Sequence, residues 1–168
     1  MIIKCPGCLA EFQKTTDEPI SHPYIGALPE CWSIFNEILA KEFSDPEYFK
    51  VHRITVDAYC ASHIGDQNDR RARQSANLHL MALYLMFEEK KEGKDILSFL
   101  KKMTETKRDW PPLLQRDHSQ WLTVKDVIQA RDAFSHSIRI TEWGNSVWES
   151  YMDCHSQIRV TYKQSITS

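Results

Sequence analysis

The chain has 168 residues, of which 42% are hydrophobic and 26% charged, and its formal net charge is −2. This composition predicts one folded domain with its own core and excludes disordered and fibrous proteins. Basic residues are interleaved with acidic ones, as in "FEEKKEGKD", so no positive surface for nucleic acid is predicted, and no run approaches the roughly 20 apolar residues of a membrane span.

The N-terminal sequence "MIIKCPGC" has no apolar run of the kind found in a secretory signal, so we expect a cytoplasmic protein. Five cysteines, an odd number, in such a chain favour thiols and metal ligands over a disulfide framework. We predict no nucleic-acid partner and no membrane partner. A small-molecule or protein partner stays open.

Residues 1–31 are predicted to form a looped lead-in, because prolines and glycines interrupt the sequence repeatedly. Residues 32–160 are predicted to be mainly helical. The segment "LPECWSIFNEILAKEF" spaces its apolar residues as a helix does, and "SDPEYFKVHRITVDAYCASH" follows as a second helix. In this second helix Asp45 is a suitable cap and Pro46 occupies the first helical position.

Further helices follow the turn "HIGDQNDR". "RRARQSANLHLMALYLMFEEKK" and "DILSFLKKMTETK" are amphipathic, whereas the two prolines of "RDWPPLLQRDHSQW" indicate a loop. Thr123 to Asp126 resembles a capping box that opens "TVKDVIQARDAF". The segment "HSIRITEWGNSVWESYMDCHSQIRV" is predicted to be a last long helix with a kink at Gly144, and "IRVTYKQ" is the one run that alternates as a strand would.

These segments predict a mainly α fold. We expect a single domain over residues 1–168, an antiparallel bundle of about four to five helices with a metal-bound irregular N-terminal segment. No internal repeat and no domain boundary interrupts it.

The "CPGC" motif places two thiols in one tight turn, which is the usual half of a tetrahedral zinc site. A zinc ribbon is excluded because the chain has no second C-x2-C motif. The nearest further ligands give the spacing C-x2-C-x13-H-x8-C, so the predicted zinc ligands are Cys5, Cys8, His22 and Cys31. Such a site would pin the lead-in to the start of the first helix.

Two other interpretations of the motif stay open. Cys5 and Cys8 could form a redox dithiol, although the strand-and-helix context of thioredoxin-like proteins is missing, or they could be unligated thiols. Cys60 and Cys154 lie in helical patterns and are interpreted as small core residues.

The histidines outside the lead-in suggest a second site. His52 and His63 share one helical face but would lie about 16 Å apart in a continuous helix, so they cannot share a metal unless the helix ends before His63. His118 is expected to be solvated in its polar loop. An internal site would draw on four candidates, each of which is otherwise a hydrogen-bonded core residue: Asp57, His63, His79 and His136.

An arginine cluster precedes the third long helix. Arg70, Arg71 and Arg73 could hold an anionic ligand at the helix N-terminus, but pairing with Asp66 and Asp69 or simple solvation is the preferred interpretation.

The sequence resembles a bacterial family of unknown function. The matching stretches are "CPGC", "HPYIGALPECW", "EFSDPEYFKVHRITVDAYCASHIGD", "QSANLHLMAL" and "WGNSVWESYMDCH", and the family would have "QHPGD" where Ser62 and Ile64 give "SHIGD". The resemblance implies no activity. It implies the following positions of interest: Cys5, Cys8, His22, Cys31, His52, Asp57, His63, His79 and His136.

Two functions are therefore predicted. The first is a zinc-binding helical protein in which the metal is mainly structural and the protein acts as a binding or interaction module. The alternative is a metal-dependent enzyme, a hydrolase or thiol transferase, with His63, His79 and His136 as ligands and Asp57 as their orienting group or base. A thiol redox protein is a third, weaker idea.

Overall fold

The computed structural model describes residues 1–118 and 121–168; residues 119–120, inside the predicted loop "RDWPPLLQRDHSQW", lie outside the described part. Within that part the chain is mainly helical, as predicted, and adds one short hairpin. The elements are β1 (Ile2–Lys4), β2 (Glu11–Gln13), α1 (Pro29–Ser44), α2 (Pro46–Phe49), α3 (His52–Ser62), α4 (Arg70–Phe87), α5 (Gly93–Glu105), α6 (Val124–Val127), α7 (Ala133–Ser150), a 3-10 turn η1 (Met152–Cys154) and α8 (His155–Thr167).

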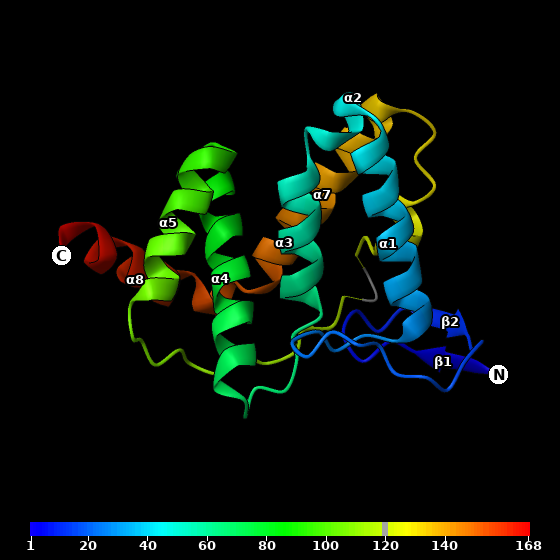
Figure 1. The fold of residues 1–168 in the computed structure, drawn as a ribbon, viewed down its shortest axis with the longest axis horizontal. Helices are drawn as coiled ribbons and strands as arrows, with labels where there is room; N and C mark the ends of the chain where they lie inside the picture. The colour runs from blue at the N-terminus through cyan, green and yellow to red at the C-terminus, as the bar shows by residue number, and fades with distance from the viewer. Residues whose placement is uncertain (119–120) are drawn as a thin grey trace.

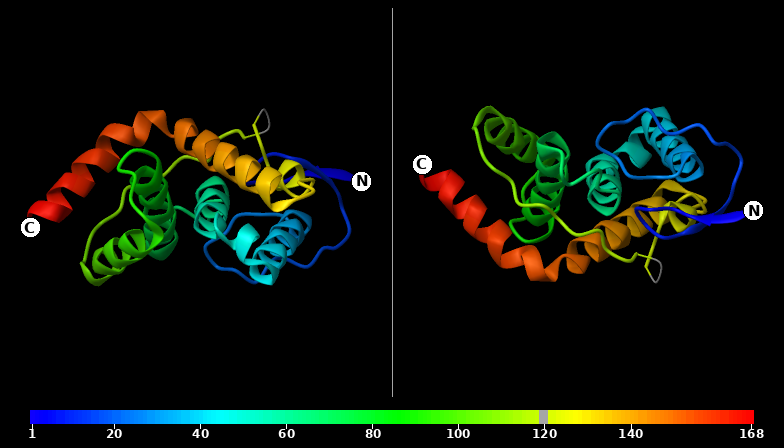
Figure 2. Two further views of the ribbon diagram at one scale, coloured as in Figure 1. Left: turned by 90° about the horizontal axis from the view of Figure 1, so that it is seen from above. Right: turned by 90° about the horizontal axis from the view of Figure 1, so that it is seen from below.

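Helices α1, α3, α4 and α5 stand side by side, and α7 and α8 run along one side of this row (Figures 1 and 2). The largest helix contacts are those of α3 with α4 and with α7. The described residues thus form eight α-helices, two of them single turns, rather than the four to five of the predicted bundle. The hairpin of β1 and β2 lies at the foot of α1.

The segment predicted as the second helix is divided into α2 and α3. Asp45 caps α2 as expected, its Oδ1 accepting a hydrogen bond of 2.8 Å from the Glu47 amide. Val51 then leaves the helical conformation, with φ −106° and ψ 6°, so the chain turns before His52 begins α3. Because α3 ends at Ser62, His63 is released from the helix.

The last predicted helix is also divided. Helix α7 is continuous through Gly144, and the break comes later, at η1. Gly144 is instead a point of close approach, because a Cβ there would collide with Ile54 and Phe87. The alternating run "IRVTYKQ" lies inside α8, so its interpretation as a strand is wrong. The capping box of Thr123 and Asp126 is present at α6.

The core is continuous from the hairpin to α8. Helix α4 contributes a buried apolar stripe that includes Leu80 and Leu83, and α7 adds the fully buried rings of Trp143 and Trp148. In the described part of the chain, no helix has both the length and the apolar character needed to cross a bilayer.

Candidate metal centre

The β1–β2 hairpin folds its "CPGC" turn so that both thiols point into the protein. The Cys5 amide donates to the Ala10 carbonyl and the Leu9 amide donates to the Cys5 carbonyl, each at 2.9 Å. Leu9 adopts a φ of 59°, the left-handed region that costs a non-glycine residue about 1–2 kcal/mol. Cys5 is 0% and Cys8 2% exposed, so this strained turn holds two buried sulfur atoms.

The third thiol comes from the first turn of α1. Pro29 occupies the first helical turn, where its missing amide hydrogen costs nothing, and Cys31 is 0% exposed. The Glu30 carboxylate accepts hydrogen bonds from the Thr15 amide at 2.5 Å and from the Thr15 hydroxyl at 2.9 Å. These bonds tie the lead-in to the start of α1 and bring Cys31 to the hairpin.

The fourth member of the group is His63, directly after α3. Its Nδ1 lies 2.9 Å from the Tyr59 carbonyl oxygen, so we assign the proton to Nδ1. Nε2 then faces the thiols, 3.3 Å from the Cys31 sulfur, where a bound metal ion would take its lone pair in place of a proton. Gly7 makes this approach possible, because a Cβ at that position would collide with the His63 ring and come within 2.7 Å of the Gly26 carbonyl oxygen.

Together these four residues form one compact, buried cluster, which we call the Cys3His cluster: Cys5, Cys8, Cys31 and His63. Its ligand atoms all lie within 4.8 Å of one another, and no other such group of three or more occurs in the described residues. Four ligands at tetrahedral corners about 2.3 Å from a zinc ion lie about 3.8 Å apart, a spacing inside that limit. The donor set and its geometry therefore fit a structural zinc ion.

The four side chains of the Cys3His cluster shift one another's pKa values because they are buried close together. Hydrogen bonds from the Cys31 and Cys8 thiols hold the pKa of Cys5 well below its usual range, whereas interactions with Cys5 and Cys8 raise the pKa of Cys31. Burial alone would lower the pKa of His63, but hydrogen bonds with Cys5 and Cys8 outweigh it and raise the pKa to about 9. Either shared protons or a cation must satisfy so many lone pairs in one dry volume.

A second layer of contacts fixes these donors. The Tyr59 hydroxyl lies 3.6 Å from the Cys31 sulfur, and the Tyr59 ring stacks on His63 at 4.0 Å between centroids. The Gln115 side-chain amide donates to the Gly7 carbonyl at 2.8 Å and to the Ser62 carbonyl at 2.9 Å. This bridge joins the "CPGC" turn to the end of α3, so the donors on the hairpin and on α3 hold a fixed distance.

His22, predicted as the histidine of this group, lies outside the Cys3His cluster. It is exposed, its Nδ1 accepts a hydrogen bond of 3.2 Å from the Tyr24 amide, and its ring packs beside Trp32 at 5.7 Å. The structure thus brings together the three predicted cysteines but supplies a different histidine. No motif in the sequence marks His63 as the partner of the three cysteines; its position depends on the close packing of residues 24–26 against 63–65, where Gly26 and Gly65 leave no room for a Cβ.

The other candidates lie in separate places. Asp57 and His79 form a pair, with Nδ1 of His79 donating to Asp57 Oδ1 at 2.7 Å. His136 lies on α7, where it bonds to Glu42, a residue that the sequence analysis did not select. His63, His79 and His136 therefore do not converge on one metal position.

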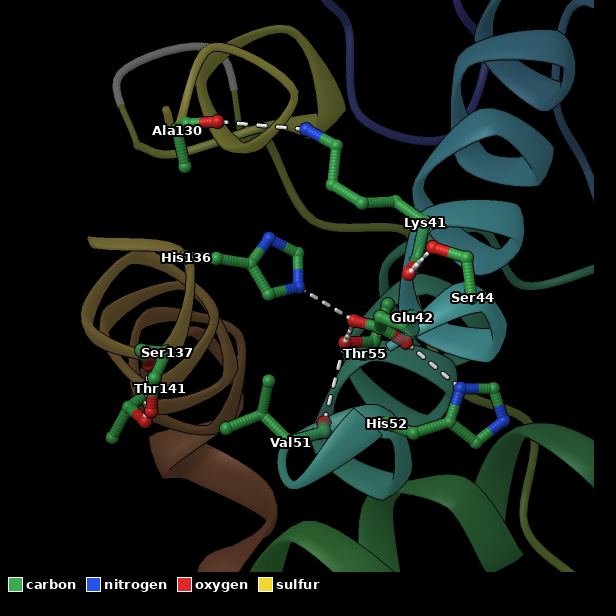
Figure 3. A network of polar contacts seen from close by, with 10 residues as sticks. All are labelled: Lys41, Glu42, Ser44, Val51, His52, Thr55, Ala130, His136, Ser137 and Thr141. Atoms are coloured by element: carbon green, nitrogen blue, oxygen red, sulfur yellow. Dashed lines mark hydrogen bonds and ion pairs between the residues drawn. The ribbon is translucent and has the colours of Figure 1, made fainter. Parts of the chain in front are cut away.

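Figure 3 shows the Glu42 group, in which one carboxylate joins three helices. Glu42 of α1 is 0% exposed and accepts hydrogen bonds from three side chains. The donors are His52 Nδ1 at 2.8 Å, the Thr55 hydroxyl at 2.5 Å and His136 Nε2 at 2.8 Å. The carboxylate pairs the buried His136 ring and holds the half-buried His52 and the buried Thr55 hydroxyl, so the arrangement acts as a polar lock between α1, α3 and α7.

Replacing Glu42 by alanine is expected to lower the free energy of unfolding by about 3 kcal/mol, because it leaves the buried His136 Nε2 without a partner and removes the acceptor of His52 and of the shorter Thr55 bond. Denaturant unfolding followed by circular dichroism measures the change. Glu37→Ala is the matched control, because Glu37 is an exposed glutamate on the same helix. Equal midpoints for the two variants would contradict the lock.

The loop histidine His118, expected to be solvated, is in fact buried at 1% exposure. Among the residues that the structure describes, neither ring nitrogen has a hydrogen-bond partner. Burial, and next the charge of His63, lower the pKa of His118 to about 4, so the ring is neutral. The loop folds back over the protein here, which its polar composition did not indicate.

Comparisons with known proteins add the family. Neither the curated proteins nor the solved structures contain a match to this chain. Among family profiles, residues 3–152 match DUF5946, which is described as a family of unknown function. This range includes every residue of the Cys3His cluster and most of the helices. The chain therefore belongs to the DUF5946 family.

Proposed function

We propose that this protein is a helical binding module whose fold is fastened by one zinc ion in the Cys3His cluster. The single observation that supports it is the convergence of three thiols and one imidazole within 4.8 Å, all of them buried. The three parts of the chain that meet there are the hairpin, the start of α1 and the end of α3. A metal at this point would cross-link the glycine- and proline-rich lead-in to the helices and add to the few apolar side chains that it buries.

Zinc is the metal that these donors favour. Thiolates are soft ligands, and a closed set of three cysteines and one histidine is a standard structural zinc site. A bound zinc ion would supply cross-linking between the three segments and no redox chemistry. All four ligand positions come from the protein, which favours a structural role over a catalytic one, since catalytic zinc keeps one position for water or substrate.

The metal content of untagged protein, purified without added metal, tests the proposal. We expect one zinc ion per chain by mass spectrometry. We also expect Cys5, Cys8 and Cys31 to resist alkylation, whereas the half-buried Cys60 and Cys154 react. Two metal ions per chain would favour the metal-dependent enzyme instead. A metal-free protein with a reversible disulfide between Cys5 and Cys8 would contradict both functions and favour redox chemistry.

A further inference from the structure

A second site is suggested by a pocket of about 600 Å³ between α3, α4 and α5, a size typical of small-molecule sites. None of the Cys3His cluster residues lines it. Helices α4 and α5 run in opposite directions, so the start of α4 and the end of α5 lie at one end of the molecule (Figure 1). The pocket collects cations from both ends: Arg70 and Arg71 from α4 and Lys107 from just after α5.

The wall of the pocket on the α3 side carries a buried charge group. Asp57 is 0% exposed and accepts two hydrogen bonds from Arg53, at 2.6 Å from Nε and 2.5 Å from Nη2. His79 donates to the same carboxylate at 2.7 Å. Burial opposes a charge on His79, but interactions with Cys60 and Asp57 outweigh it and raise its pKa to about 10. Arg53 and His79 therefore share the Asp57 carboxylate, which fixes both side chains on this wall of the pocket.

The rim adds cations that have no partner of their own. The side chains of Arg70, Arg71 and Lys107 make no hydrogen bond or ion pair among the described residues, although all three line the pocket. Glu105 is the one acidic lining residue. Asp69, the expected partner of the arginines, instead caps α4 by accepting from the Arg71 amide at 2.8 Å. Unpaired guanidinium groups around a concave surface are the usual means of binding phosphate.

The pocket is also coupled to the Cys3His cluster through the lead-in. Tyr24 lines the pocket, and the next residue, Ile25, forms a bridge with Ile64. The Gly26 amide donates to the His63 carbonyl at 3.0 Å. The metal-binding residue His63 and the aromatic wall of the pocket are therefore held by one short strap of backbone.

We propose that this pocket binds a small organic phosphate. The phosphate would contact Arg70 and Arg71 at the first turn of α4, and the organic part would extend along the pocket against Tyr24 and the apolar side chains Leu78 and Leu100 that also line it. The assignment rests on the proposed binding role and gives it a ligand class. Two exposed guanidinium groups can each form a bidentate pair with phosphate oxygens, which favours a dianionic phosphate over a monoanionic carboxylate.

Calorimetric titration of the zinc-loaded protein tests this, with phenyl phosphate, inorganic phosphate and benzoate as probes. Phenyl phosphate is expected to bind with a Kd below about 1 mM, tighter than either of the other two. Arg71→Gln is expected to weaken it by at least about tenfold, because one charge-assisted pair is lost. Arg131→Gln is the matched control, since Arg131 is an exposed arginine outside the pocket; it should bind like the unmodified protein.

Three results would overturn the assignment: no binding of phenyl phosphate, equal weakening by Arg71→Gln and Arg131→Gln, or benzoate binding as tightly as phenyl phosphate. Zinc is counted in the same samples. One zinc per chain without phosphate binding would remove the pocket assignment and leave the zinc site. If the purified protein binds phenyl phosphate but contains no zinc, the pocket assignment stands and the proposed zinc site is contradicted.

Discussion

Replacing Cys8 by serine is expected to remove the zinc ion and to lower the free energy of unfolding by on the order of 5 kcal/mol. The binding free energy of a structural metal is part of the folding free energy, because the unfolded chain offers no assembled site. Serine keeps the size of the side chain but not the soft thiolate. Zinc content by mass spectrometry and chemical denaturation measure the two effects.

The matched control for Cys8→Ser is Cys154→Ser, which changes a half-buried cysteine outside the Cys3His cluster. It should keep one zinc and nearly full stability. A tight chelator supplies a second comparison, since it should lower the stability of the unmodified protein but leave that of Cys8→Ser unchanged. Unaltered zinc content and unaltered stability in Cys8→Ser would refute the structural metal site.

The cysteines of the site were predictable from the sequence, whereas its histidine was not. Cys5 and Cys8 share a tight turn, and Cys31 follows at the start of a helix, so spacing along the chain was informative. His63 is 32 residues after Cys31 in the sequence and joins the cysteines only because the end of α3 packs against the hairpin. Its role depends on where α3 ends, and helix ends are the least certain part of any pattern. His22 was nearer in sequence but points to Tyr24 and Trp32.

Among the helices, too, long periodic segments were predictable from the sequence, whereas short or ambiguous segments were not. The stripe of α4 is strongly periodic and was predicted well. In α8 the buried residues follow helical spacing; they are His155, Ile158, Thr161, Tyr162 and Ser165. In the short run "IRVTYKQ", however, Ile158, Val160 and Tyr162 alternate with polar residues, and this pattern favoured a strand. The strands β1 and β2 have three residues each, too few for any alternation to be recognised.

The hydrophobic pattern of the sequence also did not predict which carboxylates are buried. Glu42 stands between Lys41 and Phe43 in the sequence, and nothing along the chain shows that its carboxylate will be surrounded by His52, Thr55 and His136. Asp57 gained attention only because histidines stand near it in the sequence. Glu42 meets its partners from α3 and α7, and Asp57 meets His79 from α4, so these contacts exist only after the helices pack, whereas the Arg53–Asp57 pair lies within α3.

The strongest test of the fourth ligand compares His63→Gln with His22→Gln. His63→Gln is expected to weaken metal binding by more than about 100-fold, because a direct ligand is lost and not merely a group that orients one. His22→Gln should bind as the unmodified protein does, since His22 is exposed and lies outside the Cys3His cluster. Competition with a chromophoric chelator measures the affinity of each variant.

Cobalt substitution separates loss of a ligand from loss of packing, which matters because His63 is 1% exposed. Cobalt in a tetrahedral site of three sulfurs and one nitrogen absorbs visible light strongly, and a change of one ligand alters that spectrum. Glutamine at position 63 should change it, whereas glutamine at position 22 should not. The opposite result, an altered spectrum for His22→Gln alone, would mean that the lead-in reaches the metal through His22. In that case His63 would be left as a stacking partner of Tyr59, its ring 4.0 Å away.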